Sequence, residues 1–163
     1  MAFLSQAMNV FNQQPILGQV DMIPSPNVIP AQILSTSSAT SIQVGDVVKL
    51  VDGTSATFLV DKCSGPTDGP VYGVIAYNNR KNVYKAGDLL DVMASKSFVH
   101  LLAGGAIARG DKVTTTASTT AADPTVATVS TPSTQYVTGV AMDKIASGAL
   151  GRIEIAPSFN TTV

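Results

Sequence analysis

The stretch ARGDKVTT, residues 108–115, contains a Gly-Asp pair that occurs three times in this chain of 163 residues. Glycine adopts positive φ values at little cost, and an aspartate side chain readily bonds nearby backbone, so the pair is typical of turns. Each of the three pairs stands directly before an apolar run. We therefore predict structural turns, each beginning a strand, at Gly45, Asp46, Gly87, Asp88, Gly110 and Asp111.

Arg109-Gly110-Asp111 is also the tripeptide that many adhesion receptors bind. The other two Gly-Asp pairs follow Val44 and Ala86, so the pair recurs in this chain without the arginine. Because the recurrence gives the pair a structural cause, a turn is favoured over an adhesion signal.

A longer order of glycines recurs around these turns. The positions are Gly45, Gly73 and Gly87 in the first half and Gly110, Gly139 and Gly151 in the second. Corresponding glycines are 65, 66 and 64 positions apart. Separations that agree so closely indicate a duplicated β-unit, in which residues 44–93 should superpose on residues 109–157.

Nine short runs with apolar alternation, separated by Gly, Pro and Asn turn signals, predict strands. They cover residues 44–51, 57–63, 71–77, 88–94, 97–104, 111–116, 125–130, 135–142 and 151–157. Charged residues make up only 13% of the chain, which does not fit a helical bundle rich in Glu, Lys and Arg. The predicted fold class is all-β, a small β-barrel or sandwich of two similar halves with an extended N-terminal arm.

Residues 1–43 differ in composition from the rest, with one charged residue and four prolines among many Ile, Leu, Val and Met. Proline disfavours regular helix and central strand, so an extended segment is expected. Before it, apolar residues at helical spacing between Phe3 and Phe11 predict a short amphipathic helix. The predicted division is therefore an arm over 1–43, with this helix, and a β-barrel body over 44–163.

An extended apolar segment needs a surface on which to bury its side chains, whether its own body, a neighbouring subunit or another protein. We predict that it binds outside its own core, so deletion of residues 1–40 should leave the body folded. The candidate capsid or subunit contacts of the arm are Phe3, Phe11, Ile16, Leu17, Ile23, Ile29 and Leu34.

The sequence offers little for catalysis or for binding of metal or nucleic acid. His100 and Cys63 are the only histidine and cysteine, which excludes an internal disulfide and a Cys- or His-rich zinc site. Three turn carboxylates could cluster around Ca²⁺, but no calcium-loop pattern is present and each has a local role. The net charge is −1 without a basic run, and no apolar run is long enough to span a membrane. We expect no enzyme, no cofactor, no metal, no nucleic-acid partner and no membrane partner.

The body, over about residues 42–157, resembles the head decoration or capsid cement proteins of tailed bacteriophages. The resemblance rests on IQVGDVVKL (42–50), GPVYGVIA (69–76), LAGGAIARGDKVTT (102–115) and TQYVTGVAMDKIASGALGRIEIAP (134–157). The proline-rich arm departs from the shortest members of that family.

The resemblance implies a structural protein on the outer surface of the virion, made in the host cytoplasm, that stabilises the capsid by bridging major capsid subunits. It also implies a homo-oligomer, with a trimer favoured over a dimer, and the major capsid protein as partner. The alternative is a receptor- or glycan-binding β-module of a phage fibre or surface protein. The Thr-rich segment 114–138 would suit it, but several aromatic residues fall within predicted strands.

Overall fold

The computed structural model describes residues 16–20, 26–37, 39, 41–51, 58–78, 80–116, 124–131 and 134–159. Within these ranges the regular structure consists of strands, which form two closed five-stranded barrels and one two-stranded sheet. The described residues contain no helix that is long and apolar enough to cross a membrane. The predicted helix between Phe3 and Phe11 lies outside them.

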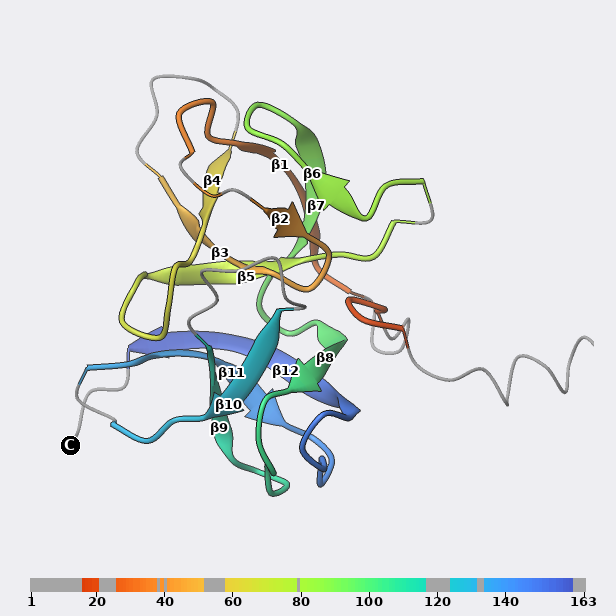
Figure 1. Ribbon diagram of the computed structural model, residues 1–163, viewed down its shortest axis with the longest axis vertical. Helices are drawn as coiled ribbons and strands as arrows, with labels where there is room; N and C mark the ends of the chain where they lie inside the picture. The colour runs from red at the N-terminus through yellow and green to blue at the C-terminus, as the bar shows by residue number, and fades with distance from the viewer. Residues whose placement is uncertain are drawn as a thin grey trace, which may run out of the picture.

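The first barrel is the upper body in Figure 1, and its strands follow the order β1-β4-β3-β5-β7 around the wall. A small sheet of two short strands, β2 and β6, lies beside it. The bounds are β1 Val28–Ile33, β2 Ile42–Gln43, β3 Val47–Leu50, β4 Leu59–Lys62, β5 Val71–Ile75, β6 Val83–Tyr84 and β7 Leu89–Met93.

The second barrel is the lower body in Figure 1 and repeats this arrangement, in the order β10-β8-β12-β11-β9. Its strands are β8 Phe98–Ala103, β9 Lys112–Thr115, β10 Thr125–Thr128, β11 Tyr136–Ala141 and β12 Leu150–Phe159. The register is repeated as well: β1 pairs with β4 in parallel through Gln32 and Leu59, and β8 pairs with β10 in parallel through Leu102 and Thr125. The predicted all-β fold of two similar halves is therefore confirmed.

Two of the three predicted glycine correspondences agree with the structure, and the third is wrong. Gly148, not Gly151, is the counterpart of Gly87: both have positive φ, +84° and +74°. Their N–H groups donate to the carbonyl oxygens of Ile33 and Ala103, the last residues of β1 and β8. The second copy of this turn carries Ala149 where the first has Asp88, so its Gly-Asp signature is lost.

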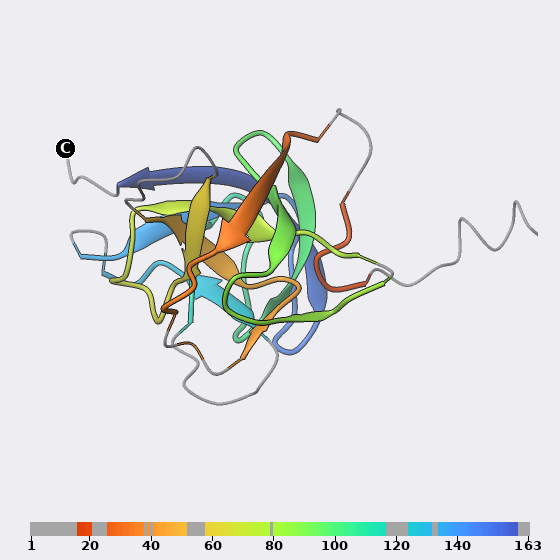
Figure 2. The ribbon, with the colours of Figure 1, turned by 90° about the horizontal axis from the view of Figure 1, so that it is seen from above.

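The predicted division at residue 43 also differs from the structure. Strand β1, orange in Figure 2, pairs antiparallel with β7 over five residues and belongs to the wall of the first barrel. It contains Pro30, which led us to expect an arm. The Gln32 N–H faces β4, and the described pairing with β4 begins only at Gln32. An N–H at position 30 would point to that same side, two residues before the described pairing with β4 begins, so proline there removes none of the described ladder bonds.

The two barrels pack against each other through an apolar contact. Val48 and Ile75 point into the first barrel, whereas their neighbours Val47 and Val74 pack in one cluster with residues of the second barrel, such as Val99. Strands β3 and β5 are thus apolar on both faces because both faces are covered. This contact fixes the two halves as one body.

Candidate functional site

The N-terminal segment 16–20 lies at the junction of the two barrels. Gly18 donates its N–H to the His100 carbonyl oxygen (2.8 Å), and the His100 N–H donates to the Gln19 carbonyl oxygen (2.9 Å). On the first barrel, the Tyr77 N–H donates to the Gly18 carbonyl oxygen (2.9 Å). Val20 extends the attachment through an antiparallel bridge to Val99. The segment therefore connects both barrels by backbone hydrogen bonds.

A single sequence difference explains why the segment pairs with β8 of the second barrel and not with the corresponding strand β1 of the first. His100 in β8 and Pro30 in β1 occupy corresponding places, opposite Arg152 and Asp91 in the neighbouring strands. Proline has no N–H to donate, whereas His100 uses both its N–H and its carbonyl oxygen to hold the segment.

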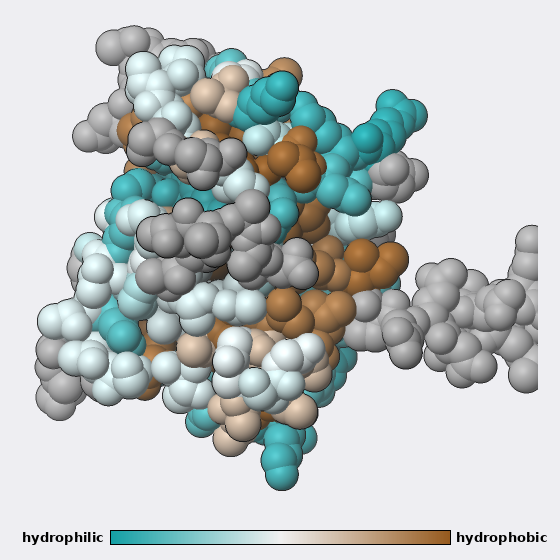
Figure 3. All heavy atoms as spheres, in the orientation of Figure 1, coloured by the Kyte–Doolittle hydropathy of each residue, from teal (hydrophilic) through white to brown (hydrophobic). Residues whose placement is uncertain are grey.

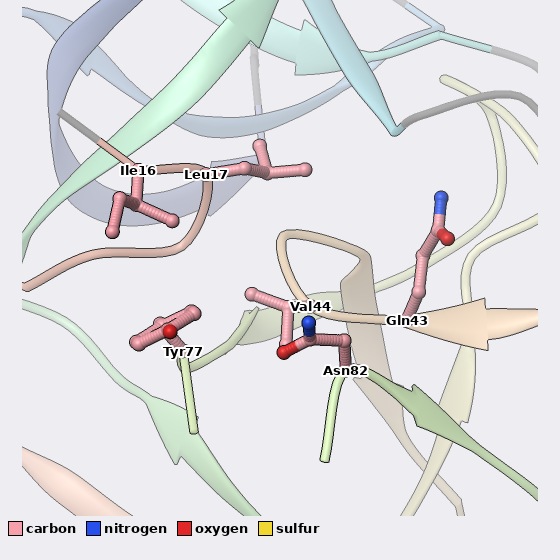
Figure 4. Close-up of a pocket in the computed structure, with 6 residues that line it drawn as sticks. All are labelled: Ile16, Leu17, Gln43, Val44, Tyr77 and Asn82. Atoms are coloured by element: carbon pink, nitrogen blue, oxygen red, sulfur yellow. The ribbon is translucent and has the colours of Figure 1, made fainter. Parts of the chain in front are cut away.

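A hollow of about 180 Å³ opens where this segment meets the first barrel. In Figure 4, Ile16 and Leu17 of the segment lie across from residues of the first barrel. Ile16 is 47% exposed and Tyr77 is 38% exposed, so the walls of this hollow are open to a partner. Its lining residues are Ile16, Leu17, Gln43, Val44, Tyr77 and Asn82.

A second, wider hollow of about 390 Å³ shares Tyr77 with the first. Val28, 44% exposed, and the buried Met93 contribute to its walls, together with Val20 of the segment. Figure 3 shows the resulting apolar surface, in brown, between the two barrels. Exposed apolar patches of this kind mark interaction sites. We call the two hollows together the junction surface.

The structure brings together only part of the predicted set of arm contacts. Ile16 and Leu17 lie in the junction surface, as described above. Ile29 and Leu34 belong to the first barrel, within β1 and directly after it, so they are not free arm residues. Phe3, Phe11 and Ile23 lie outside the described residues.

The three predicted Gly-Asp sites share one turn geometry. Gly45, Gly87 and Gly110 have φ values of +86°, +84° and +88°. In each turn the aspartate carboxylate accepts the backbone N–H of the residue three positions earlier, at 2.7, 2.7 and 3.0 Å for Asp46, Asp88 and Asp111. The aspartates therefore act on their own backbone.

The three carboxylates differ in their surroundings. Asp46 is 2% exposed and pairs with Lys62 (2.8 Å), and burial raises the pKa of Asp46 despite this partner. Asp88 lies at the surface, where the hydrogen bond from Lys81 lowers its pKa. Asp111 also accepts the Thr128 hydroxyl (3.3 Å). Each carboxylate thus has partners in its own turn and one beyond it, and no cluster suited to a metal occurs among the described residues.

We expect Arg109→Ala to leave stability unchanged within about 0.5 kcal/mol, because Arg109 is exposed and lies outside the turn hydrogen bonds. Gly110→Val should cost about 1–3 kcal/mol, because a β-branched residue is strained at a φ of +88°. Urea unfolding of both variants measures this order. A larger loss for Arg109→Ala would contradict the assignment of this tripeptide as a turn.

The remaining reactive side chains have structural surroundings. Cys63 is 3% exposed in the contact between the barrels, and burial raises the pKa of its thiol to about 12. A thiol so buried is protonated at neutral pH and a poor nucleophile. His100 is half-buried, and its backbone holds the N-terminal segment.

Sequence reasoning missed the first-barrel half of the junction surface, above all Tyr77 and Asn82. It also missed Phe58, which is 52% exposed and stacks on Tyr72 with ring centroids 6.4 Å apart. The sequence does contain a signal for this region. Corresponding positions of the two halves are 65 or 66 residues apart before Tyr77, but Gly87 and Gly148, after it, are only 61 apart. The first half therefore contains extra residues between these points.

Comparison with known proteins gives a family and a fold. Residues 8–156 match the family described as XM1 gp53 minor capsid protein. Among solved structures, the head fiber gp8.5 N base of bacteriophage phi29 is similar, with a TM-score of 0.52 and 19% identity over 85% of this chain and 98% of that chain. At that identity the likeness shows the fold. None of the curated proteins searched matches the sequence.

Proposed function

The chain belongs to the XM1 gp53 minor capsid protein family, and we propose that it binds the outside of the phage head and stabilises it by bridging major capsid subunits. Membership makes it a phage capsid-associated structural protein, in agreement with the resemblance to phage head proteins. The bridging role, the outer-surface position and the absence of enzymatic activity are parts of the proposal.

The junction surface is the observation that carries this proposal. Exposed apolar side chains at Ile16, Val28 and Tyr77 line two adjoining hollows on a body whose two barrels are packed together. A rigid body with an apolar contact face suits a protein that holds neighbouring subunits in place. The fold likeness to the phi29 protein supports the outer surface, because that protein is described as the N base of a head fiber.

Oligomerisation would strengthen such binding. Each copy in a homo-oligomer, with a trimer favoured, would contact a different coat subunit, so release of one contact would be reversed by the others. Avidity of this kind stabilises a shell without requiring a tight single contact.

The test adds purified protein to capsids that lack it and measures occupancy by quantitative gel and by electron microscopy. We expect saturable binding, density on the outer surface and a higher temperature of capsid disruption. Protection of the protein from added protease until the virion is opened would place it inside and overturn the proposal, as would absence of binding.

A receptor- or glycan-binding module is the second candidate, and the exposed stack of Phe58 on Tyr72 is the observation that favours it. Aromatic faces are common platforms for sugars. Phe58→Ala should then abolish binding on a glycan array or to host cells while leaving capsid occupancy unchanged. If the wild-type protein binds neither, this second function is excluded.

A further inference from the structure

The duplicated fold serves as an internal reference for which segments the barrel needs. In the first barrel, seven residues, Tyr77–Val83, separate Ala76 from Tyr84, whereas the second barrel has only Asp143 and Lys144 at this place. The flanks correspond in their hydrogen bonds: the Ala76 N–H donates to the Asp91 carbonyl oxygen and the Met142 N–H to the Arg152 carbonyl oxygen.

The far ends of these loops correspond too. Tyr84 pairs with Ile42 in the first barrel, and Ile145 pairs with Ile107 in the second. Because the second barrel closes with a two-residue connection, the longer connection in the first barrel is not required for closure. We call residues 77–83 the insertion. Since closure of the barrel does not require its extra length, we look for a role of the insertion in binding.

The described residues of the insertion, 77, 78 and 80–83, lie at the side of the first barrel in Figure 1, between β5 and β6. The charged residues of the insertion, Arg80 and Lys81, are both basic. In the corresponding connection of the second barrel, the opposite charges of Asp143 and Lys144 sum to zero. Lys81 pairs with Asp88 and lies 5.3 Å from the Tyr84 ring centroid, so it anchors the loop to the barrel. Arg80 is exposed.

The insertion also builds the smaller hollow of the junction surface. Tyr77 and Asn82, near its two ends, line this hollow together with Ile16 and Leu17 of the N-terminal segment. The hollow measures about 180 Å³. A buried cavity of about 150 Å³ holds benzene, so this hollow has room for one large apolar side chain. Arg80 lies between Tyr77 and Asn82 in the sequence, so the loop that lines the apolar hollow also carries an exposed positive charge.

We propose that the insertion and Ile16 form the grip on an acidic segment of the major capsid protein, with one apolar side chain of that segment in the hollow and a neighbouring carboxylate opposite Arg80. This inference rests on the proposed function and identifies the part of the surface that performs it. The two cations of the insertion, Arg80 and Lys81, are too few for a nucleic acid, whose affinity comes from many phosphate contacts. Opposite charges speed association and fix the orientation of a protein partner.

The test measures binding of the full chain and three variants to capsids that lack the protein. Arg80→Glu places a negative charge opposite the acidic segment and should raise the half-saturating concentration at least tenfold. Arg109→Glu makes the same change on an exposed turn of the second barrel and should stay within twofold of wild type. Ile16→Asp tests the apolar half of the grip and should also weaken binding at least tenfold. Thermal melts of all variants should match wild type, since the three positions are exposed.

The outcomes separate this inference from the function on which it rests. If the wild-type protein binds capsids and Arg80→Glu binds equally well, the grip is elsewhere and only this inference falls. If the wild-type protein does not bind, the proposed function falls. If Arg80→Glu loses oligomerisation in sedimentation while each copy still binds capsids, the surface joins two copies of this chain and the coat assignment is overturned.

Discussion

Replacement of Gly139 by valine should strongly destabilise the second barrel. Gly139 lies in β11 opposite Ile155, next to a shift in the register with β12. A Cβ atom at this position would overlap the Glu154 carbonyl oxygen and press against the Ile153 side chain. The obstacle is backbone of a paired strand, which cannot move without breaking the β11–β12 ladder. We expect a loss of more than about 3 kcal/mol.

Calorimetry and urea unfolding measure the effect, and Gly105→Val is the matched control. A Cβ at Gly105 would meet nothing within 4 Å, and its φ is not positive, so the same change there should cost less than about 0.5 kcal/mol. The corresponding glycine of the first barrel, Gly73, faces the Met93 carbonyl oxygen in the same way. Gly73→Val should therefore damage the first barrel to a similar extent. A melting temperature of Gly139→Val within two degrees of that of Gly105→Val would refute the close approach of Gly139 to the Glu154 backbone.

The strands could be predicted because the alternation of apolar residues and the Gly-containing turns are features of short stretches of sequence. The nine predicted runs correspond to β3, β4, β5 and β7 in the first barrel and β8 to β12 in the second. β1 was missed because Pro30 argues against a strand, and its tolerance depends on where β4 begins, which is a tertiary fact. Gly148 was missed because Ala149 removes the Gly-Asp signature that marks the other turns.

The junction surface could be predicted only in part. Ile16 and Leu17 stood out as apolar residues in a proline-rich segment, but their position depends on the His100 backbone, some eighty residues away in the sequence. Tyr77 and Asn82 carry no motif, and only the comparison of the two copies shows that they belong to an inserted loop. A site assembled from segments so far apart follows from the closed topology, not from local pattern.

Deletion of residues 1–40 should destroy the first barrel, contrary to what the sequence alone led us to expect. The deletion removes β1, which pairs with β4 and β7 and contributes Ala31 and Ile33, 0% and 1% exposed, to the core. Loss of one large buried side chain costs about 1.5–3 kcal/mol, and loss of a wall strand also opens the barrel and exposes the rest of its core. The total exceeds what a domain with about 5–15 kcal/mol of stability tolerates.

A series of N-terminal truncations separates the residues that the fold needs from those that only contact a partner. Deletion of residues 1–15 keeps every described strand and the hydrogen bonds of Gly18, so both barrels should melt as in the full chain. Deletion of residues 1–20 removes the backbone bonds to His100 and Tyr77 but retains β1, so the barrels should persist with a weakened junction. Circular dichroism and calorimetry report the folding of each variant.

Capsid occupancy of the same variants then separates two roles of the N-terminal region. If residues 1–15 make the contact predicted for Phe3 and Phe11, their deletion should lower occupancy although the body melts normally. If the grip at Ile16 and the insertion is sufficient, occupancy should fall only when residues 16–20 are removed as well. A folded first barrel in the 1–40 deletion would show that β1 is dispensable, and the assignment of residues 28–33 to the wall of the barrel would then be wrong.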